Sequence, residues 1–298
     1  MPAVSPYAFK LEQIPTVHAY VDVSGLRTDY WEYGDSSSPL QLVLIHGFRG
    51  DHHGLEPIVA ELGPGVHAVI PDLPGFGHSE ALPSPANIDS FSRWLIQFLE
   101  VIGADKDVVV LGHSFGSIVV GGAAAQGLTQ RRIIMINPIA ANALKGPRGI
   151  MTRLAVLYYK AAAALPARAG YALLKNKLIV RVMSETMAKT DDKNLRQWIN
   201  EQHDQYFSLF DSRDSVLEAF ETSVSNDVSM FAPKIHQKLL MLVADKDDIT
   251  ALPEQKLLAS RIPGAQIEVV EGVGHLVHYE APDFAAKHIQ AFLDEAKK

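Results

Sequence analysis

The chain has 298 residues, of which 47% are hydrophobic, enough for one large domain or for a domain with a sizeable insertion. Its formal net charge of −7 argues against a nucleic-acid partner, and the absence of cysteine excludes disulfides, thiolate metal sites and a cysteine nucleophile. We see no signal peptide and no run of the roughly 20 apolar residues that a membrane span needs. We therefore expect a cytoplasmic protein without a membrane span, of unknown oligomeric state.

The first half of the chain alternates predicted strands with predicted helices. Two strands joined through Ser24 and Gly25 form an antiparallel start, and a continuous aliphatic run over residues 40–45 is typical of a strand buried on both faces. The strands expected here span residues 16–23, 26–33, 40–45, 66–70, 108–111 and 133–136. The expected helices span residues 55–62 and 87–102, and a further apolar stretch with helical potential begins at residue 118.

The strand pattern stops between about residue 140 and residue 232. Helices are predicted there over residues 150–164, 178–189, 193–210 and 214–224. Strands over residues 239–244 and 266–271 follow, with helices over 253–261 and from 282 to about 296. Strands alternating with helices predict an α/β fold with a doubly wound, mostly parallel eight-stranded sheet. We expect a core domain of residues 1–139 and 233–298, and an inserted all-helical cap of residues 140–232.

A serine stands at the turn between one of these strands and the helix after it. The sequence Gly112-His113-Ser114-Phe115-Gly116 is a G-x-S-x-G motif in the strand-to-helix context of a nucleophile elbow. Such a turn forces its central residue into a strained backbone conformation and leaves no room for side chains two positions before and after it. Ser114 is therefore a candidate nucleophile. The same motif also occurs as a plain Gly/Ser turn, so the hypothesis depends on the other strand ends.

Acidic and basic groups follow two later strands. Asp245, Asp247 and Asp248 come after the strand over residues 239–244, and His275 comes after the strand over residues 266–271. Since the carboxyl ends of parallel strands meet at one edge of the sheet, these groups are expected near Ser114. Serine, acid and histidine then occur in the chain order Ser, Asp, His.

These ordered motifs resemble those of the α/β-hydrolase-fold serine hydrolases, and the resemblance covers nearly the whole chain. His46-Gly47-Phe48 resembles the oxyanion loop of that family, and residues 72–79 resemble its D-x-x-G-x-G-x-S loop. Gly274-His275, followed by an acidic residue and Pro282, resembles its histidine loop. The resemblance implies the α/β-hydrolase fold with a helical cap after the strand that ends near residue 136.

The resemblance also suggests which acid completes the site. Asp247 lies three residues beyond the strand end, as in the family's G-x-x-D loop with Ala244 at the glycine, so we assign it as the acid. Asp245 and Asp248 are the alternatives. The family sometimes places this acid after the preceding strand, but that position is Asn137, which carries no charge.

Each residue type has a role in nucleophilic catalysis. A serine hydroxyl needs a base whose pKa is near the working pH, which His275 supplies for Ser114, and Asp247 would hold the imidazole in the required tautomer. His278 is a second candidate base, although a structural hydrogen bond fits its position better. The backbone N–H groups of Phe48 and Phe115 are expected to form the oxyanion hole.

We expect no metal and no cofactor. Four histidines, at positions 46, 52, 53 and 78, fall on loops near one another, but none belongs to an H-E-x-x-H or H-x-x-E-H pattern. The predicted cap helices carry many aromatic residues and methionines, so we expect an apolar cavity. Gly47, Tyr158 and Trp198 are the expected substrate-binding residues.

The predicted function is that of a carboxylesterase-like hydrolase, of class EC 3.1.1, acting on a small hydrophobic acyl substrate through an acyl-enzyme. Family members that attack with an aspartate are set aside because residue 114 is serine. Two alternatives remain open. One is a carbon-carbon bond hydrolase of the β-diketone or meta-cleavage type. Such enzymes have a glycine-rich oxyanion loop, which residues 46–50 of this chain do not match. The other is a small-molecule receptor on the same fold that does not turn its ligand over.

Overall fold

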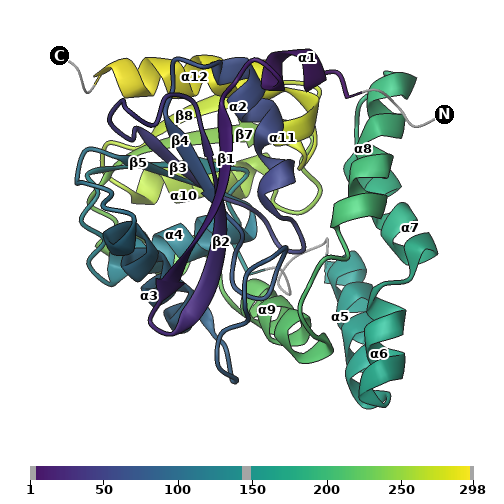
Figure 1. Ribbon diagram of the computed structural model, residues 1–298. Coiled ribbons are helices and arrows are strands. Elements are labelled where there is room, and N and C mark those ends of the chain that lie inside the picture. The colour runs from purple at the N-terminus through teal and green to yellow at the C-terminus, as the bar shows by residue number, and fades with distance from the viewer. Residues whose placement is uncertain (1–4, 143–148, 296–298) are drawn as a thin grey trace.

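The computed structural model describes residues 5–142 and 149–295, which form an eight-stranded sheet in the order β1-β2-β4-β3-β5-β6-β7-β8 (Figure 1). Strand β1 pairs antiparallel with β2, and β2 with β4, whereas all the remaining neighbours are parallel. The strands are β1 (Thr16–Val23), β2 (Leu26–Tyr33), β3 (Leu42–Ile45), β4 (Ala68–Pro71), β5 (Val109–His113), β6 (Arg132–Ile136), β7 (Lys238–Ala244) and β8 (Gln266–Val270). The predicted fold class is confirmed, and the strand ends shift by only one or two residues.

The aliphatic runs form strands because both faces of the sheet are buried. In β7, Met241 and Val243 pack into a hydrophobic cluster with helices α3 (Ile88–Val101), α4 (Phe115–Ala125) and α10 (Leu252–Arg261). Leu240 and Leu242 point the other way, into a cluster with α2 (Glu56–Leu62) and α12 (Pro282–Asp294). Alternate residues of one strand thus enter opposite layers, so no polar alternation remains in the sequence.

Short elements complete this part of the chain. They are the helices α1 (Ala8–Leu11) and α11 (Val277–Glu280) and the 3₁₀ turns η1 (His52–Gly54), η2 (Val228–Met230) and η3 (Ala232–Lys234). None of them was predicted, because three or four residues are too few to show a helical period. Helix α4 begins at Phe115, three residues before the apolar run from Ile118 suggested, because the elbow starts the helix directly after Ser114.

The described residues between β6 and β7 form five α-helices, and four of them, α5 to α8, stand to one side of the sheet in Figure 1. They are α5 (Gly149–Ala164), α6 (Ala167–Leu174), α7 (Lys177–Met187), α8 (Lys193–Tyr206) and α9 (Arg213–Ser225). Helix α6 was not predicted. It packs closely on α5 because Gly170 has no side chain: a Cβ there would lie 2.2 Å from the carbonyl oxygen of Ala162. No helix in residues 5–142 and 149–295 is long and apolar enough to cross a membrane.

Candidate functional site

The turn between β5 and α4 has the geometry that its glycines suggested. Ser114 has φ 52° and ψ −116°, a left-handed conformation that non-glycine residues rarely adopt. A Cβ at Gly112 would lie 2.4 Å from the carbonyl oxygen of Gly116, and one at Gly116 would lie 2.3 Å from that of Ile45. Any side chain at either position would therefore push the turn apart, and the strain at Ser114 is held by close backbone packing.

Ser114, His275 and Asp247 come together at the carboxyl ends of β5, β8 and β7. His275 Nε2 lies 2.8 Å from Ser114 Oγ, and His275 Nδ1 lies 2.8 Å from Asp247 Oδ2. The second carboxylate oxygen of Asp247 accepts hydrogen bonds from the backbone N–H groups of Ile249 and Thr250, at 2.8 and 3.1 Å. Both Asp247 and His275 are buried. The carboxylate is thus fixed, and the imidazole bridges it to the serine hydroxyl.

The alternative acids and base lie elsewhere. Asp245 accepts the N–H of Gly272 at 2.7 Å, and Asp248 forms an ion pair with Lys189 at 2.5 Å. The ring of His278 packs against His113 with centroids 4.1 Å apart. Burial, followed by the charge of His113, lowers the pKa of His278 well below its usual range. Among the described residues, Asp247 is the only candidate acid that contacts His275.

The loop after β3 passes beside the serine. A Cβ at Gly47 would lie 3.3 Å from Ser114 Cβ and 3.0 Å from His113 Nδ1, so the backbone of this loop contacts the elbow directly. The rings of Phe48 and Phe115 meet edge to face, with centroids 6.4 Å apart, and Phe115 is the first residue of α4. The oxyanion role of the two backbone N–H groups stays a prediction.

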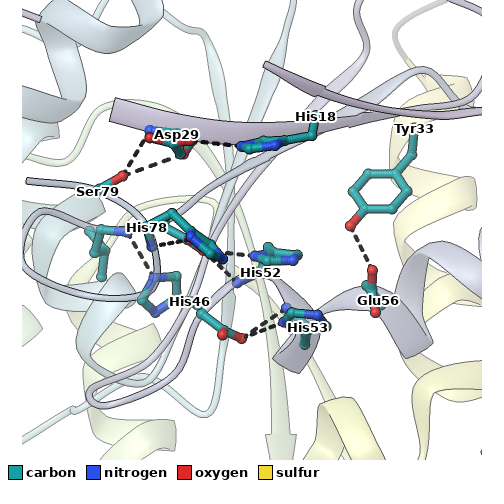
Figure 2. Close-up of polar contacts among 12 residues, drawn as sticks. His18, Asp29, Tyr33, His46, His52, His53, Glu56, His78 and Ser79 are labelled. Atoms are coloured by element: carbon teal, nitrogen blue, oxygen red, sulfur yellow. Dashed lines mark hydrogen bonds and ion pairs between the residues drawn. The ribbon is translucent and has the colours of Figure 1, made fainter. Parts of the chain in front are cut away.

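His46 connects this loop to the next motif. Its Nδ1 lies 2.8 Å from the carbonyl oxygen of Gly47, and its Nε2 lies 2.8 Å from the backbone nitrogen of Leu73 (Figure 2). Since a carbonyl can only accept and a backbone N–H can only donate, His46 is a neutral imidazole with both nitrogens engaged. Its burial also lowers its pKa. His46 therefore serves as a brace between two loops.

Three consecutive residues are grouped as metal ligands often are. Asp51, His52 and His53 each offer a ligand atom, and these atoms lie within 4.8 Å of one another. Both imidazoles, labelled in Figure 2, already have carboxylate partners: His53 Nδ1 lies 3.1 Å from Asp51 Oδ1, and His52 Nδ1 lies 2.9 Å from Asp72 Oδ1, outside the group of three. A cation would have to compete with the bond between His53 and Asp51. The expectation of no metal stays a prediction.

Several histidines are buried in their neutral form. The pKa of His52 falls to about 2, through burial and then the charge of His53. The pKa of His113 falls to about 3, through burial and then His275, and that of His203 also falls to about 3, through burial and then Arg181. These groups take up protons in the unfolded chain at a pH where the folded protein cannot bind them.

We expect the protein to lose stability as the pH falls below about 6.5. Each of these three histidines has no effect on the free energy of unfolding above about pH 6.5, the pKa of histidine in the unfolded chain. By pH 5 each lowers that free energy by about 2 kcal/mol, because only the unfolded chain binds the proton. Two raised pKa values act in the opposite direction and reduce this loss of stability. Burial raises the pKa of Asp72. Burial lowers the pKa of His53, but the hydrogen bond and charge of Asp51 outweigh it and raise that pKa overall. Urea unfolding at pH 7.5 and pH 5 measures the difference. Equal free energies of unfolding at the two pH values would contradict this expectation.

Two adjoining cavities border the site. One, of about 170 Å³, is lined in part by Gly47, Phe48, Ser114 and His275. The other, of about 650 Å³, also touches His275. Its apolar lining comes mainly from α5, α7 and α9 and from the loop after β7, namely Ala155, Met183, Met187, Phe220, Val224 and Ile249, and the charged residues Glu185, Lys189 and Asp248 also line it. Gly47, an expected substrate-binding residue, lines the smaller cavity, and its role in binding stays a prediction. The larger cavity combines apolar side chains with a few charged ones.

Tyr158 and Trp198 do not line either cavity, contrary to expectation. Tyr158 donates its hydroxyl to the carbonyl oxygen of Leu173 at 3.0 Å, because its face of α5 is turned toward α6. Trp198 packs edge to face against Tyr7 and Tyr279, with centroids 5.3 and 5.2 Å away. Both are packing residues in this structure. Met183 and Met187, four residues apart on α7, take the lining role, and that spacing was the available signal.

Two further residues tie the histidine loop in place. The carboxylate of Glu280 accepts the backbone N–H groups of Lys189 and Thr190, each at 2.5 Å, and that of Gly274 at 3.2 Å. Asn137, at the end of β6, donates its side-chain amide to the carbonyl oxygen of Gly274 at 3.0 Å. Residue 274 directly precedes His275, so both contacts fix the position of the imidazole. Neither role was predicted from the sequence.

Comparison with known proteins gives consistent results. A family model described as "Alpha/beta hydrolase family" matches residues 42–288. Lipase 3 of Moraxella sp. (strain TA144) is 24% identical over 280 residues, covering 92% of this chain and 84% of the lipase. Lipase 1 of Psychrobacter immobilis is 28% identical over 279 residues, covering 90% and 81%. The enol-lactonase from Burkholderia xenovorans LB400 has a TM-score of 0.76 at 19% identity, covering 93% of this chain and 100% of that chain, which shows a shared fold.

Proposed function

Because the chain belongs to the alpha/beta hydrolase family, we propose that it is a serine hydrolase that cleaves a carboxylic ester or related acyl bond of a small hydrophobic substrate. The observation that carries this proposal is the pair of 2.8 Å contacts that His275 makes with Ser114 on one side and Asp247 on the other. A nucleophile, a base and an orienting acid within hydrogen-bond reach are what acyl transfer requires.

The reaction has two halves. Ser114 Oγ attacks the acyl carbon while His275 Nε2 takes the hydroxyl proton, and the negative charge moves to the carbonyl oxygen, which the N–H groups of Phe48 and Phe115 stabilise. The intermediate then expels the alcohol, which receives the proton from His275, and an acyl-Ser114 ester remains. Water attacks this ester while His275 takes one of its protons, and His275 then returns that proton to Ser114 Oγ as the carboxylic acid leaves. Asp247 stabilises the imidazolium in both halves.

The surroundings of the serine support a hydrophobic substrate. The larger cavity is lined by Met183, Met187 and Phe220, and such a surface favours an apolar acyl or alcohol group. The two curated relatives named as lipases agree with this substrate class. We also propose that the helices α5 to α9, within the predicted cap of residues 140–232, act as the lid that excludes water during acyl transfer.

Reaction with a fluorophosphonate tests the proposal, because the reagent modifies an activated serine. We expect one adduct by intact mass, mapped to Ser114, together with turnover of p-nitrophenyl butyrate and octanoate. Ser117 is the internal control, because its hydroxyl is already bonded to the carbonyl of Ser114 and accepts the N–H of Ile139. Labelling without ester turnover would favour a receptor or a carbon-carbon bond hydrolase. No labelling would contradict the proposed nucleophile.

A further inference from the structure

Arg49 is a fully buried cation in the loop that follows β3. It directly follows Phe48, the proposed oxyanion residue, and its side chain is 0% exposed. Its backbone has φ 63°, a left-handed conformation that is uncommon for a residue with a side chain. The ion pairs found in residues 5–142 and 149–295 do not include Arg49. A buried guanidinium needs compensation, so its partners define what this residue does.

Among the described residues, the hydrogen-bond acceptors of the Arg49 side chain all belong to the helical block between β6 and β7, including the hydroxyl of Ser208 at 3.5 Å. Its Nε donates to the carbonyl oxygen of Phe207 at 3.0 Å, and its Nη2 donates to that of Leu174 at 2.7 Å. Its Nη1 donates to the hydroxyl of Tyr159 at 3.2 Å. The rings of Phe207 and Phe210 lie about 5.5 Å from the guanidinium carbon. The guanidinium therefore bridges α5, α6 and the end of α8.

The two carbonyl acceptors lie where helices end. Leu174 is the last residue of α6, and Phe207 is the residue that caps α8. Carbonyls of a last turn have no partner within their own helix and carry the negative end of the helix dipole. One planar guanidinium thus satisfies two helix ends at once, a geometry that the single ammonium group of lysine cannot reproduce.

The segment that Arg49 contacts is itself anchored on the core. Gly77 donates its N–H to the carbonyl oxygen of Leu209 at 2.9 Å, and Asp211 donates to that of Gly75 at 3.0 Å. Beside it, the ring of His53 stacks on Tyr206 of α8, with centroids 3.7 Å apart. The segment after α8 is therefore held against the core by backbone hydrogen bonds. Through Arg49, the loop after β3 is hydrogen-bonded to the ends of α6 and α8.

We propose that Arg49 is a positioning residue, which directs the Phe48 N–H toward Ser114 when α6 and α8 are seated over the site. This inference rests on the proposed acyl transfer for its effect on rate, but the coupling between loop and helices does not. If the helices lift, the guanidinium loses its acceptors, and the left-handed turn at residue 49 loses the contacts that hold it. The oxyanion site is then complete only while α6 and α8 are in contact with Arg49.

Arg49→Lys and Arg49→Met test this coupling. We expect kcat for p-nitrophenyl butyrate to fall about 100-fold, the usual effect of a misplaced catalytic group, with KM changed much less. Arg213→Met is the matched control. Arg213 also donates to a carbonyl just beyond a helix of the same block, that of Leu165 at 2.9 Å, but is not part of the oxyanion loop. This control should keep the kcat of the unaltered protein.

Amide hydrogen exchange gives a second result that needs no turnover. In Arg49→Lys we expect faster exchange at residues 47–50 and at residues 174–175 and 207–209 together, whereas Arg213→Met should leave residues 47–50 unchanged. Unchanged kcat and unchanged exchange at residues 47–50 in Arg49→Lys would overturn the inference and leave the proposed function standing. If the unaltered protein proves inactive, the exchange result alone decides the coupling. If Arg49→Met does not fold, Arg49→Lys, which keeps the positive charge, tests the coupling by itself.

Discussion

Ser114→Ala is expected to lower kcat for ester hydrolysis by about a millionfold, the scale seen when a triad nucleophile is removed. The hydroxyl is the atom that forms the acyl-enzyme, and no neighbouring group replaces it. The fold should be unaffected, because Ser114 makes no side-chain capping bond at the start of α4 and alanine keeps the same Cβ in the strained turn. Kinetics with p-nitrophenyl butyrate and thermal unfolding of the same preparation measure both effects.

Ser223→Ala is the control for this change. Ser223 lines both cavities beside the site, so its replacement alters the same surface without removing the hydroxyl that His275 contacts. We expect its kcat to stay close to that of the unaltered protein. If Ser114→Ala retained turnover while fluorophosphonate labelling vanished, hydrolysis would proceed without an acyl-Ser114 intermediate, and the proposed mechanism would be wrong.

Asp247→Asn should lower kcat by about ten thousandfold. The amide can donate to His275 Nδ1, which stabilises the tautomer that carries its proton on Nε2 and so cannot accept the proton of Ser114. Because asparagine keeps an oxygen for the N–H groups of Ile249 and Thr250, the loop should hold its shape. The loss should appear in kcat, with little change in KM.

Asp245→Asn and Asp248→Asn are the matched controls, two carboxylates on the same loop. Asp245 is bonded to the N–H of Gly272 and Asp248 to Lys189, so neither change reaches the imidazole. Both variants should keep kcat within a few-fold of the unaltered protein. A large loss in either, with Asp247→Asn active, would mean that the acid has been assigned to the wrong residue.

The sheet and the elbow could be predicted because their causes are local. Burial on both faces gives β3, β5 and β7 unbroken aliphatic runs, and the contact between Gly112 and Gly116 allows no other residue type at these two positions. Asp247 was assigned from the resemblance to the family's G-x-x-D loop, which places the acid three residues beyond the end of β7. Its position against His275 follows from the parallel pairing of β7 with β8, which brings the two strand ends together.

The helical block could not be predicted to the same depth, because its contacts are between segments distant in sequence. The spacing of Tyr158 and Trp198 marks them as apolar faces of helices but does not say which neighbour each face meets. Arg49 is similar: its sequence neighbours suggest a solvated loop cation, whereas its acceptors lie 125 and 158 residues further along the chain. Only the packing of α6 and α8 shows that this charge is buried.

Asn137 has a consequence for redesign of this protein. It occupies the position at the end of β6 where related enzymes sometimes carry their acid, yet both ends of its amide are in use: Nδ2 donates to the carbonyl of Gly274, and Oδ1 accepts the N–H of Ala244. A carboxylate there would set two acceptors against each other in a buried site. The acid therefore cannot be relocated from β7 to β6 by a single substitution, and an engineer would have to rebuild the histidine loop at the same time.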